Sequence, residues 1–416
     1  MDMNLISLLV FVGVIALAFI CKVNTGLLAI IAAVGLAMAN GIKEKELFAM
    51  FDGKMFLMLM GVMYLFGIAE ENKTLDLLAK KVVNLCGGKV QLLPPLLFVL
   101  AAVISGIGPG LISATALMAV ISVALAKQIN IHPLKLLPFA TLGSFALGLT
   151  PLTPSGLVAI NKAAECGING IEWPLMWKMT LAIVLYSLIL YFPVFKWHKV
   201  KGLSMGKSEK TAAFTWQQWA TLGGILLTAV LAIPLKKTIN VGMIALAIGL
   251  VLNIIGAAEE GKVLKRIPWG TLVLIAGVGT LISMVQKLGG IDLLRSWLEP
   301  LMNSISAGPI MTILAGAMSW FSSASGVVMP TLIPVSAQLA EVTQGLSAVG
   351  LSIGVCIGAH MAALSPMSTC GGLMLAAYSS GEGVDDKARN QMFVRLFVMS
   401  ACGVLFVALL SLVGLY

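Results

Sequence analysis

Four short stretches of this sequence place serine, threonine, glycine and proline together inside otherwise apolar segments. Two of them are LTPLTPSG at 149–156 and LSPMSTCG at 364–371, and the other two are SGIGPGLIS at 105–113 and SWFSSASG at 319–326. Glycine allows a close backbone approach, proline interrupts a helix, and hydroxyl groups can bind carboxylates or hard cations. Because the flanking residues are apolar, these stretches predict a polar site inside the protein rather than surface loops.

A helix that is interrupted inside a membrane leaves unpaired backbone groups, which persist only where protein or water surrounds them. A half-helix that begins there presents N–H groups and a positive dipole end, whereas one that ends there presents carbonyl groups. The predicted substrate contacts are Gly108, Pro109, Gly110, Thr153, Pro154, Ser155, Ser322, Ser323, Ser325, His360, Ser368 and Thr369. The predicted cation contacts are Ser105, Gly108, Thr150, Gly156, Ser319, Ser322, Ser365 and Gly371. The competing interpretation is structural, since proline kinks and small-residue helix crossings occur in many helical bundles.

The composition is typical of a polytopic membrane protein. Of 416 residues, 59% are apolar and 11% are charged, whereas soluble domains have about 45–50% and about 25%. Long continuous apolar runs favour helices over a barrel, and the first run, 5–20, lacks the basic start of a signal peptide and is expected to be a retained span. The six scattered cysteines show no metal-ligand spacing and are expected to be small apolar fillers.

The sequence repeats itself at an interval of about 215–216 residues. KVNTGLLAI at 22–30 matches TINVGMIAL at 238–246, and 149–156 matches 364–371. Each half is predicted to contain three spans, a re-entrant hairpin, a broken helix and a last span, which gives about ten transmembrane helices plus two hairpins. The first repeat covers 1–203 with a hairpin at 92–126 and a broken helix at 134–160, and the second covers 215–416 with a hairpin at 305–341 and a broken helix at 349–378. An odd number of crossings per half makes the second copy inverted.

The distribution of basic residues predicts the orientation. The basic stretch KWHKVKGLSMGKSEK at 196–210 extends into the predicted linker at 204–214. The positive-inside rule places this linker in the cytoplasm. Both termini are then outside, in a bacterial-type inner (plasma) membrane, although two loops containing Lys43, Lys45, Lys236 and Lys237 count against this orientation. A lipid- or partner-binding patch is the alternative for the basic stretch. The net charge of +9 is explained first by such loops, and no nucleic-acid partner is expected.

Six segments, in order along the chain, resemble the ion transporter superfamily, most closely its malonate/dicarboxylate carrier branch, which is related to the divalent anion/sodium symporters. They are FDGKMFLMLMGVMYLFGIAEENKTLDLL, AAVISGIGPG, INIHPLKLL, LTPLTPSG, WFSSASGVVMPTLIP and LSPMSTCGG. The resemblance implies a homodimer whose subunits have a scaffold and a moving transport domain, an elevator-type arrangement. It also implies that the broken helices and the hairpin tips, here Gly108–Gly110 and Ser322–Ser325, bind Na⁺ and the substrate carboxylates. Neither tip has the Asn and Thr of the related symporters.

The charged residues near the site leave two questions open. No Lys or Arg is expected in the site, so an anion would be bound by backbone N–H and hydroxyl groups. His360 is the one ionisable residue expected within it, either as a substrate or proton contact or as an interhelical hydrogen-bond partner, and its counterpart in the first repeat is Phe145. Glu70, Glu71 and Asp76 are expected to form a solvated cap at the end of a span, with a proton relay as the alternative.

These observations predict a secondary-active transporter of a small organic anion, such as malonate or a C4-dicarboxylate. Na⁺ or H⁺ would drive it by alternating access, and no cofactor is expected. Another small anion, or an exchange mechanism, remains an alternative. A passive channel would be expected to keep an open polar pore, and an intramembrane enzyme would need a nucleophile, a base and an orienting group. Only His360 near Ser365 approaches that requirement, with no carboxylate to orient it, so no catalytic residue is predicted.

Overall fold

The computed structural model describes residues 2–21, 23–77, 81, 90–200, 212–235, 238–267, 269–379 and 384–416. Within these residues every regular element is a helix and no β-strand occurs. The predicted all-α class is therefore confirmed. The predicted linker at 204–214 lies outside the described residues as far as residue 211.

The first half of the chain contains a succession of helices that the second half repeats. Its elements are α1 (Met3–Cys21), α2 (Thr25–Ala39), α3 (Glu44–Ala49), α4 (Gly53–Glu71), η1 (Val90–Leu92), α6 (Leu93–Gly106), α7 (Gly110–Gln128), η2 (Pro133–Lys135), α8 (Leu137–Ala146), α9 (Pro154–Glu165), α10 (Glu172–Ile189), η3 (Leu190–Val194) and η4 (Trp197–Lys199). The breaks between α6 and α7 and between α8 and α9 fall within the serine-, glycine- and proline-containing stretches.

The second half follows the same order. Its elements are α11 (Trp216–Leu235), α12 (Val241–Ile254), α13 (Glu260–Arg266), α14 (Trp269–Lys287), α15 (Gly290–Leu298), η5 (Glu299–Leu301), α16 (Ala307–Phe321), η6 (Ala324–Val328), α17 (Met329–Val342), α18 (Ala348–Ala362), α19 (Thr369–Ser379) and α20 (Asp386–Leu412). The short helices α3 and α13, and the broken pairs α8–α9 and α18–α19, occupy matching places in the two series.

The long apolar helices are suited to a bilayer. In the part of the chain that the structure describes, five helices are long and apolar enough to cross a membrane: Gly53–Glu71, Gly110–Gln128, Glu172–Val194, Trp269–Lys287 and Lys387–Leu412. Shorter apolar helices of 10–17 residues accompany them, including those at 93–106 and 307–321. At 1.5 Å per residue, α6, with 14 residues, is about 21 Å long, which is less than the hydrocarbon core of about 30 Å.

Large apolar side chains lie on the outside of the molecule. Ile31 of α2 is 69% exposed, Ile254 of α12 is 75% exposed and Leu409 of α20 is 59% exposed. Trp173 and Trp216, near the starts of α10 and α11, are also exposed. Tryptophan at helix ends beside an apolar surface is typical of the membrane interface, so this surface fits contact with lipid.

Two helix crossings between the halves depend on glycine. α4 packs against α12, and α14 packs against α2. A Cβ on Gly61 would lie 2.0 Å from the carbonyl oxygen of Gly242, and a Cβ on Gly277 would lie 2.1 Å from that of Gly26. Gly61 corresponds to Gly277 and Gly26 to Gly242 in the repeat, so the two crossings are the same contact made twice with the halves exchanged.

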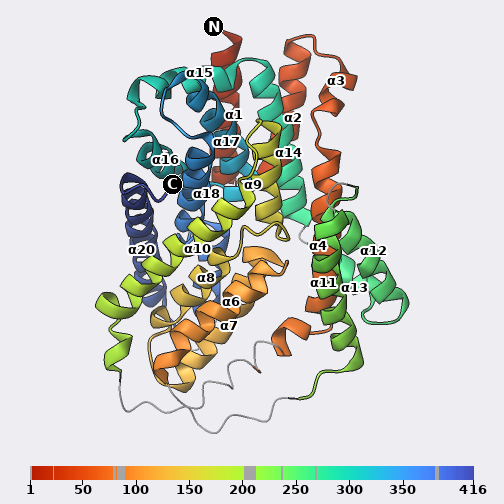
Figure 1. Cartoon of the computed structure of the whole chain (residues 1–416), viewed down its shortest axis with the longest axis vertical. Helices are drawn as coiled ribbons and strands as arrows, with labels where there is room; N and C mark the ends of the chain where they lie inside the picture. The colour runs from red at the N-terminus through yellow and green to blue at the C-terminus, as the bar shows by residue number, and fades with distance from the viewer. Residues whose placement is uncertain are drawn as a thin grey trace.

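Helices beside the breaks of one half also pack on helices of the other half. α6 packs on α8 and α16 on α18 within their own halves, whereas α9 packs on α17 and α19 on α7. Figure 1 shows α4, α11, α12 and α13 grouped at the right of the view, and α1, α2 and α14 in its upper part together with α16 and α17. The breaks are therefore held in the interior by helices of both halves.

Candidate functional site

A small cavity of about 80 Å³ lies where the first hairpin tip and the starts of α9 and η6 face α4 and α14. Its lining residues are Met63, Phe66, Gly67, Glu70, Pro109, Gly110, Leu111, Ile112, Ser113, Pro154, Ser155, Arg266, Thr271, Ile275 and Ser325. One water occupies about 10–15 Å³ on a comparable measure. The small cavity therefore has room for several waters or for one small ligand.

Three helices begin at the small cavity. α7 begins at Gly110, α9 at Pro154, and η6, which continues directly into α17, at Ala324. The first N–H groups of a helix have no partner within the helix, and its dipole is positive at that end. With Gly110, Ser155 and Ser325 all in the lining, three positive helix ends face the cavity.

Two charged side chains, Glu70 and Arg266, complete the lining. Ser113 of α7 shares this lining with Glu70. Arg266 Nε lies 3.4 Å from Oε2 of Glu71, the neighbour of Glu70 on α4. The expectation that no Lys or Arg lies in the site is therefore wrong, because α13 packs on α4 and brings Arg266 to the cavity.

Glu70 also departs from its expected place in a solvated cap. Glu71 follows that expectation, since it forms ion pairs with Arg266 and with Lys262 of α13. A carboxylate near the end of an apolar span is a signal that could have pointed to Glu70. Ser113 belongs to the polar stretch at 105–113 but is not among the predicted contacts, and Thr271 carries no comparable signal. Arg266 is separated from Glu71 by 195 residues, so their contact cannot be inferred from spacing.

The break between α8 and α9 is held by the Thr153 hydroxyl. Thr153 Oγ1 lies 2.7 Å from the carbonyl oxygen of Gly148 and 2.9 Å from that of Thr150, and it accepts a hydrogen bond of 3.1 Å from the Gly156 N–H. A Cβ on Gly156 would lie 2.0 Å from the Thr150 oxygen. The Thr150 hydroxyl in turn donates to the Gly106 carbonyl at 2.7 Å, which joins this break to the first hairpin.

The break between α18 and α19 has the same hydrogen bonds. Ser368 Oγ lies 2.7 Å from the carbonyl oxygens of both Ala363 and Ser365 and accepts from the Gly371 N–H at 3.3 Å. A Cβ on Gly371 would again lie 2.0 Å from a carbonyl oxygen, that of Ser365. In both halves the hydroxyl caps its own backbone, so the residues after Thr153, rather than Thr153 itself, reach the small cavity.

The hairpin tips approach the other elements closely. Gly108 has φ +147°, and a Cβ there would lie 1.8 Å from the Phe66 ring. In the second tip, the Ser322 hydroxyl donates to the Met318 carbonyl at 2.7 Å, and Ser323 Oγ accepts from the Gly326 N–H at 3.0 Å. Of the second tip, only Ser325 lines the small cavity.

The remaining predicted residues lie away from this lining. Ser319 donates to the Ala359 carbonyl at 2.7 Å, and Ser365 Oγ accepts from the Met367 N–H at 3.3 Å. Ser105 Oγ is buried without a hydrogen-bond partner among the described residues, whereas Thr369 is exposed. The structure thus brings five of the predicted substrate contacts to one cavity: Pro109, Gly110, Pro154, Ser155 and Ser325.

His360 is fully buried in α18 and lines neither the small cavity nor the larger one beside it. Its Nδ1 lies 2.8 Å from the carbonyl oxygen of Cys356, one helical turn earlier. Its ring packs edge to face against Phe145, with 6.4 Å between the ring centroids. Nε2 has no hydrogen-bond partner among the described residues.

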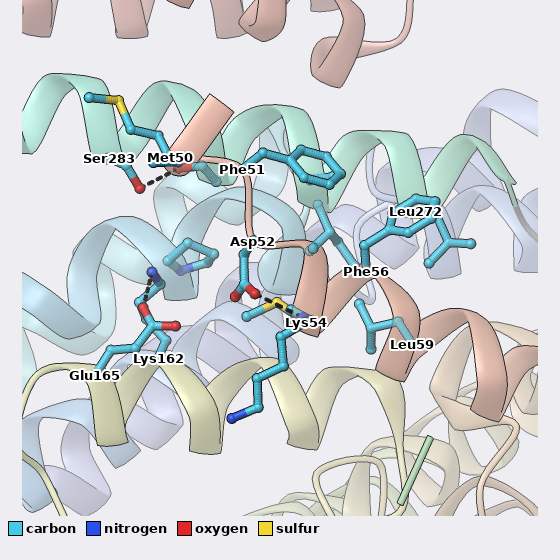
Figure 2. Close-up of a pocket in the computed structure, with 17 residues that line it drawn as sticks. Met50, Phe51, Asp52, Lys54, Phe56, Leu59, Lys162, Glu165, Leu272 and Ser283 are labelled. Carbon is cyan, nitrogen blue, oxygen red and sulfur yellow. Dashed lines mark hydrogen bonds and ion pairs between the residues drawn. The ribbon is translucent and has the colours of Figure 1, made fainter. Parts of the chain in front are cut away.

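A large cavity of about 540 Å³ lies farther along the same helices, toward the start of α4. Ile275 of α14 lines both cavities. Figure 2 shows Asp52 and Lys54 from the start of α4 facing α9, from which Lys162 and Glu165 project. Lys162 Nζ lies 2.6 Å from Glu165 Oε2, so this cavity is charged near its α9 wall and apolar at Leu59, Leu272 and Ile275.

Comparison with known proteins agrees with this arrangement. Residues 1–146, about a third of the chain, match the family described as dicarboxylate carrier protein MatC N-terminus. The fold is similar to that of the YdaH transporter of Alcanivorax borkumensis, with a TM-score of 0.58 and 14% sequence identity over 88% of this chain and 87% of that one. No protein with a curated function matches the sequence.

The chain is an integral membrane protein with a helical transporter fold. Within that class, its first 146 residues are similar to the N-terminal part of a dicarboxylate carrier.

Proposed function

We propose that the protein is a secondary-active transporter that binds a small organic anion, a dicarboxylate such as malonate or a C4-dicarboxylate, in the small cavity. The observation that carries this proposal is the convergence of the first turns of α7, α9 and η6–α17 beside Arg266. One substrate carboxylate pairs with the Arg266 guanidinium, and the other accepts from first-turn N–H groups and the Ser155 and Ser325 hydroxyls. The similarity of residues 1–146 to a dicarboxylate carrier supports this substrate class.

The two halves act as inverted repeats in an elevator-type mechanism. The matching order of helices and the exchanged glycine crossings support the repeat. α2, α4, α12 and α14 form the scaffold, and the hairpins and broken helices, α6–α9 and α16–α19, form the transport domain. The small cavity lies between these two groups, which is where a substrate must bind if one group moves past the other. Two subunits associate through their scaffolds as a homodimer in a bacterial-type inner membrane.

The two cavities lie along the route of the anion. With both termini outside, the large cavity at the start of α4 opens outward, and the small cavity lies deeper. Lys54 and Lys162 in the large cavity attract the anion, and Ile275 separates the two spaces. Alternating access then exposes the small cavity to each side in turn.

A cation gradient, of Na⁺ or H⁺, drives the transport. The buried Ser105 hydroxyl, which lies close to the Gly148 backbone and lacks a partner among the described residues, supports a cation position in the first half. Ser319, near the second hairpin tip, is instead hydrogen-bonded to Ala359, so the two halves contribute unequally. Other predicted cation contacts lie at the α8–α9 and α18–α19 breaks, among them Thr150, Gly156, Ser365 and Gly371.

Uptake of labelled malonate and succinate into proteoliposomes tests this function. We expect saturable uptake that stalls when both the Na⁺ and the H⁺ gradient are collapsed. Uptake that does not saturate would indicate a channel, uptake only against a preloaded anion would indicate an exchanger, and recovery of a chemically altered substrate would indicate an enzyme. Thermal stabilisation by one dicarboxylate but not by a monocarboxylate of similar size would identify the substrate class independently.

A further inference from the structure

Glu70 is the one carboxylate among the residues that line the small cavity, and it shares that lining with Arg266. It is partly buried, near the end of α4. The lining therefore carries one negative and one positive side chain before any ligand enters. An anion that binds there meets a carboxylate as well as a guanidinium.

The surroundings of Glu70 act on its charge in both directions. Burial disfavours the charged carboxylate, the Ser113 hydroxyl and Arg266 favour it, and Asp76 disfavours it. Among the described residues, the other elements that pack on α4 add no further charge beside Glu70: α13 directs Lys262 to Glu71, α12 contributes Asn253 to the Tyr64 hydroxyl, and α11 contributes Gln218 to the Asn72 carbonyl. α9 contributes Ser155 and α14 contributes Thr271, and the charges of α9, Lys162 and Glu165, line the large cavity instead.

A dicarboxylate in this space competes with Glu70 for both of its partners. Two carboxylates that share a small site cannot both stay ionised at low cost, so the pair takes up a proton. If the proton binds Glu70, that carboxyl no longer competes with the substrate for Arg266, which keeps its contact with Glu71. When the substrate leaves, Arg266 and Ser113 again favour the charged carboxylate, and the proton is released.

We propose, on the basis of the transport function above, that Glu70 is the proton-carrying residue that couples dicarboxylate movement to H⁺. On one side of the membrane a proton passes from water to a Glu70 carboxylate oxygen as the anion binds. On the other side the anion leaves, and the same proton returns to water. One proton is therefore moved by Glu70 with each anion, in the same direction, without a metal ion or a further reactant.

Proteoliposomes containing the full chain and a pH-sensitive dye inside test the assignment. In the wild type, malonate uptake without Na⁺ is accompanied by acidification of the lumen and accelerates as the outer pH falls. In Glu70→Gln we expect accumulation driven by the pH gradient to fall by about tenfold or more, while exchange of labelled for unlabelled malonate continues, because glutamine mimics the protonated carboxyl. Glu71→Gln, the matched control outside the lining, retains the pH dependence.

Ser113→Ala provides a second variant that leaves the carboxyl in place. Loss of the hydroxyl removes a group that favours the charged carboxylate, so the pH of half-maximal uptake moves upward relative to the wild type. Proton-driven accumulation in Glu70→Gln equal to that of the wild type, or uptake that requires Na⁺ and keeps its pH profile in both variants, would overturn the assignment. Those outcomes leave the transport function intact, whereas a wild type that neither accumulates nor exchanges any dicarboxylate overturns the proposed function itself.

Discussion

The rings of Phe145 and His360 pack edge to face with 6.4 Å between their centroids, although the two residues occupy the same position in the two halves of the chain. In the proposed pair of inverted repeats, equivalent positions can touch only near the axis that relates the two copies. α8 and α18 would then meet close to that axis, and the break after each helix would lie within a few residues of it.

Replacing His360 with phenylalanine, as in the first half, tests whether the imidazole has a role in transport. We expect an unfolding free energy equal to that of the wild type or up to about 1 kcal/mol higher, since Nε2 lacks a partner among the described residues. Dicarboxylate uptake should persist. The reverse change, Phe145→His, is the matched control and should destabilise the protein by about 1–3 kcal/mol by burying a second imidazole. A folded His360→Phe protein without uptake would instead assign the imidazole a direct role.

The hydroxyl of Thr153 is expected to matter for the stability of the break. Thr153→Val keeps the shape of the side chain but leaves the Gly156 N–H without its acceptor, and it should cost about 1–2 kcal/mol. Thr153→Ser retains the hydroxyl and should remain close to the wild type. Denaturation of the purified protein in detergent measures both variants. Equal stability of the Val and Ser variants would mean that the cap contributes nothing.

The exchanged glycine crossings predict a pair of equivalent effects. Gly61→Ala and Gly277→Ala each place a methyl group against a backbone carbonyl of the facing helix, and each should destabilise the protein by about 1–3 kcal/mol. Gly279→Ala, two residues farther along α14, meets no atom within 4 Å and should stabilise the helix by up to about 1 kcal/mol. Thermal melts of the three variants distinguish crowding from helix propensity, and a neutral Gly61→Ala variant would contradict the close crossing.

Arg266 is expected to determine substrate affinity. Arg266→Gln removes a charge-assisted hydrogen bond of about 1.5–3 kcal/mol, so the KM for a dicarboxylate should rise by about tenfold or more. Lys262→Gln is the control, because Lys262 pairs with Glu71 and Glu259 and does not line the small cavity. Initial uptake rates over a range of substrate concentrations provide the measurement. Equal KM values in the two variants would show that Arg266 does not contribute to substrate binding.

The loop between α7 and α8 contributes a pH dependence of stability. Burial lowers the pKa of His132 below its ordinary value of 6.5, and the Arg395 and Lys135 charges lower it further. The neutral ring accepts the Leu134 N–H at Nδ1 and packs on Tyr378. Its contribution is therefore complete above pH 6.5, where the unfolded state is also neutral, and is lost as the pH falls through the lower folded-state pKa.

A comparison of melting temperatures between about pH 7 and pH 5 tests this contribution. His132→Asn keeps a capping acceptor without the titration, so its melting temperature should fall less than that of the wild type. His198→Asn, which changes an exposed histidine, should follow the wild type. If all three proteins lose stability in parallel, His132 does not contribute.

The sequence was sufficient to predict the helical class and the positions at which helices are interrupted, because glycine and proline act locally on the backbone. It also predicted that Pro154, Ser155 and Ser325 belong to one site, although their convergence depends on packing between the halves. It assigned to Thr153 and Ser368 a ligand role, while their hydroxyls are hydrogen-bonded to nearby carbonyls. A hydroxyl that caps a break and one that faces a cavity have the same sequence signal.

The charged part of the lining could not be predicted from local pattern. Glu70 and Glu71 are adjacent, yet one faces the cavity and the other faces α13. Consecutive residues on a helix differ in direction by about 100°, so the sequence alone does not show which of the two faces the cavity. Arg266 reaches the cavity only through the packing of α13 on α4, a contact that requires the tertiary fold.

The sharing of α9 and α19 between the halves has a consequence for biosynthesis. α9 packs on α17, and α7 packs on α19. The ribosome synthesises α17 and α19 much later than their partners in the first half. When the first half leaves the insertion machinery, its polar break therefore lacks the helices that enclose it. The binding site must form after synthesis of the second half, and a chain truncated after the first half should be a substrate for membrane quality-control proteases.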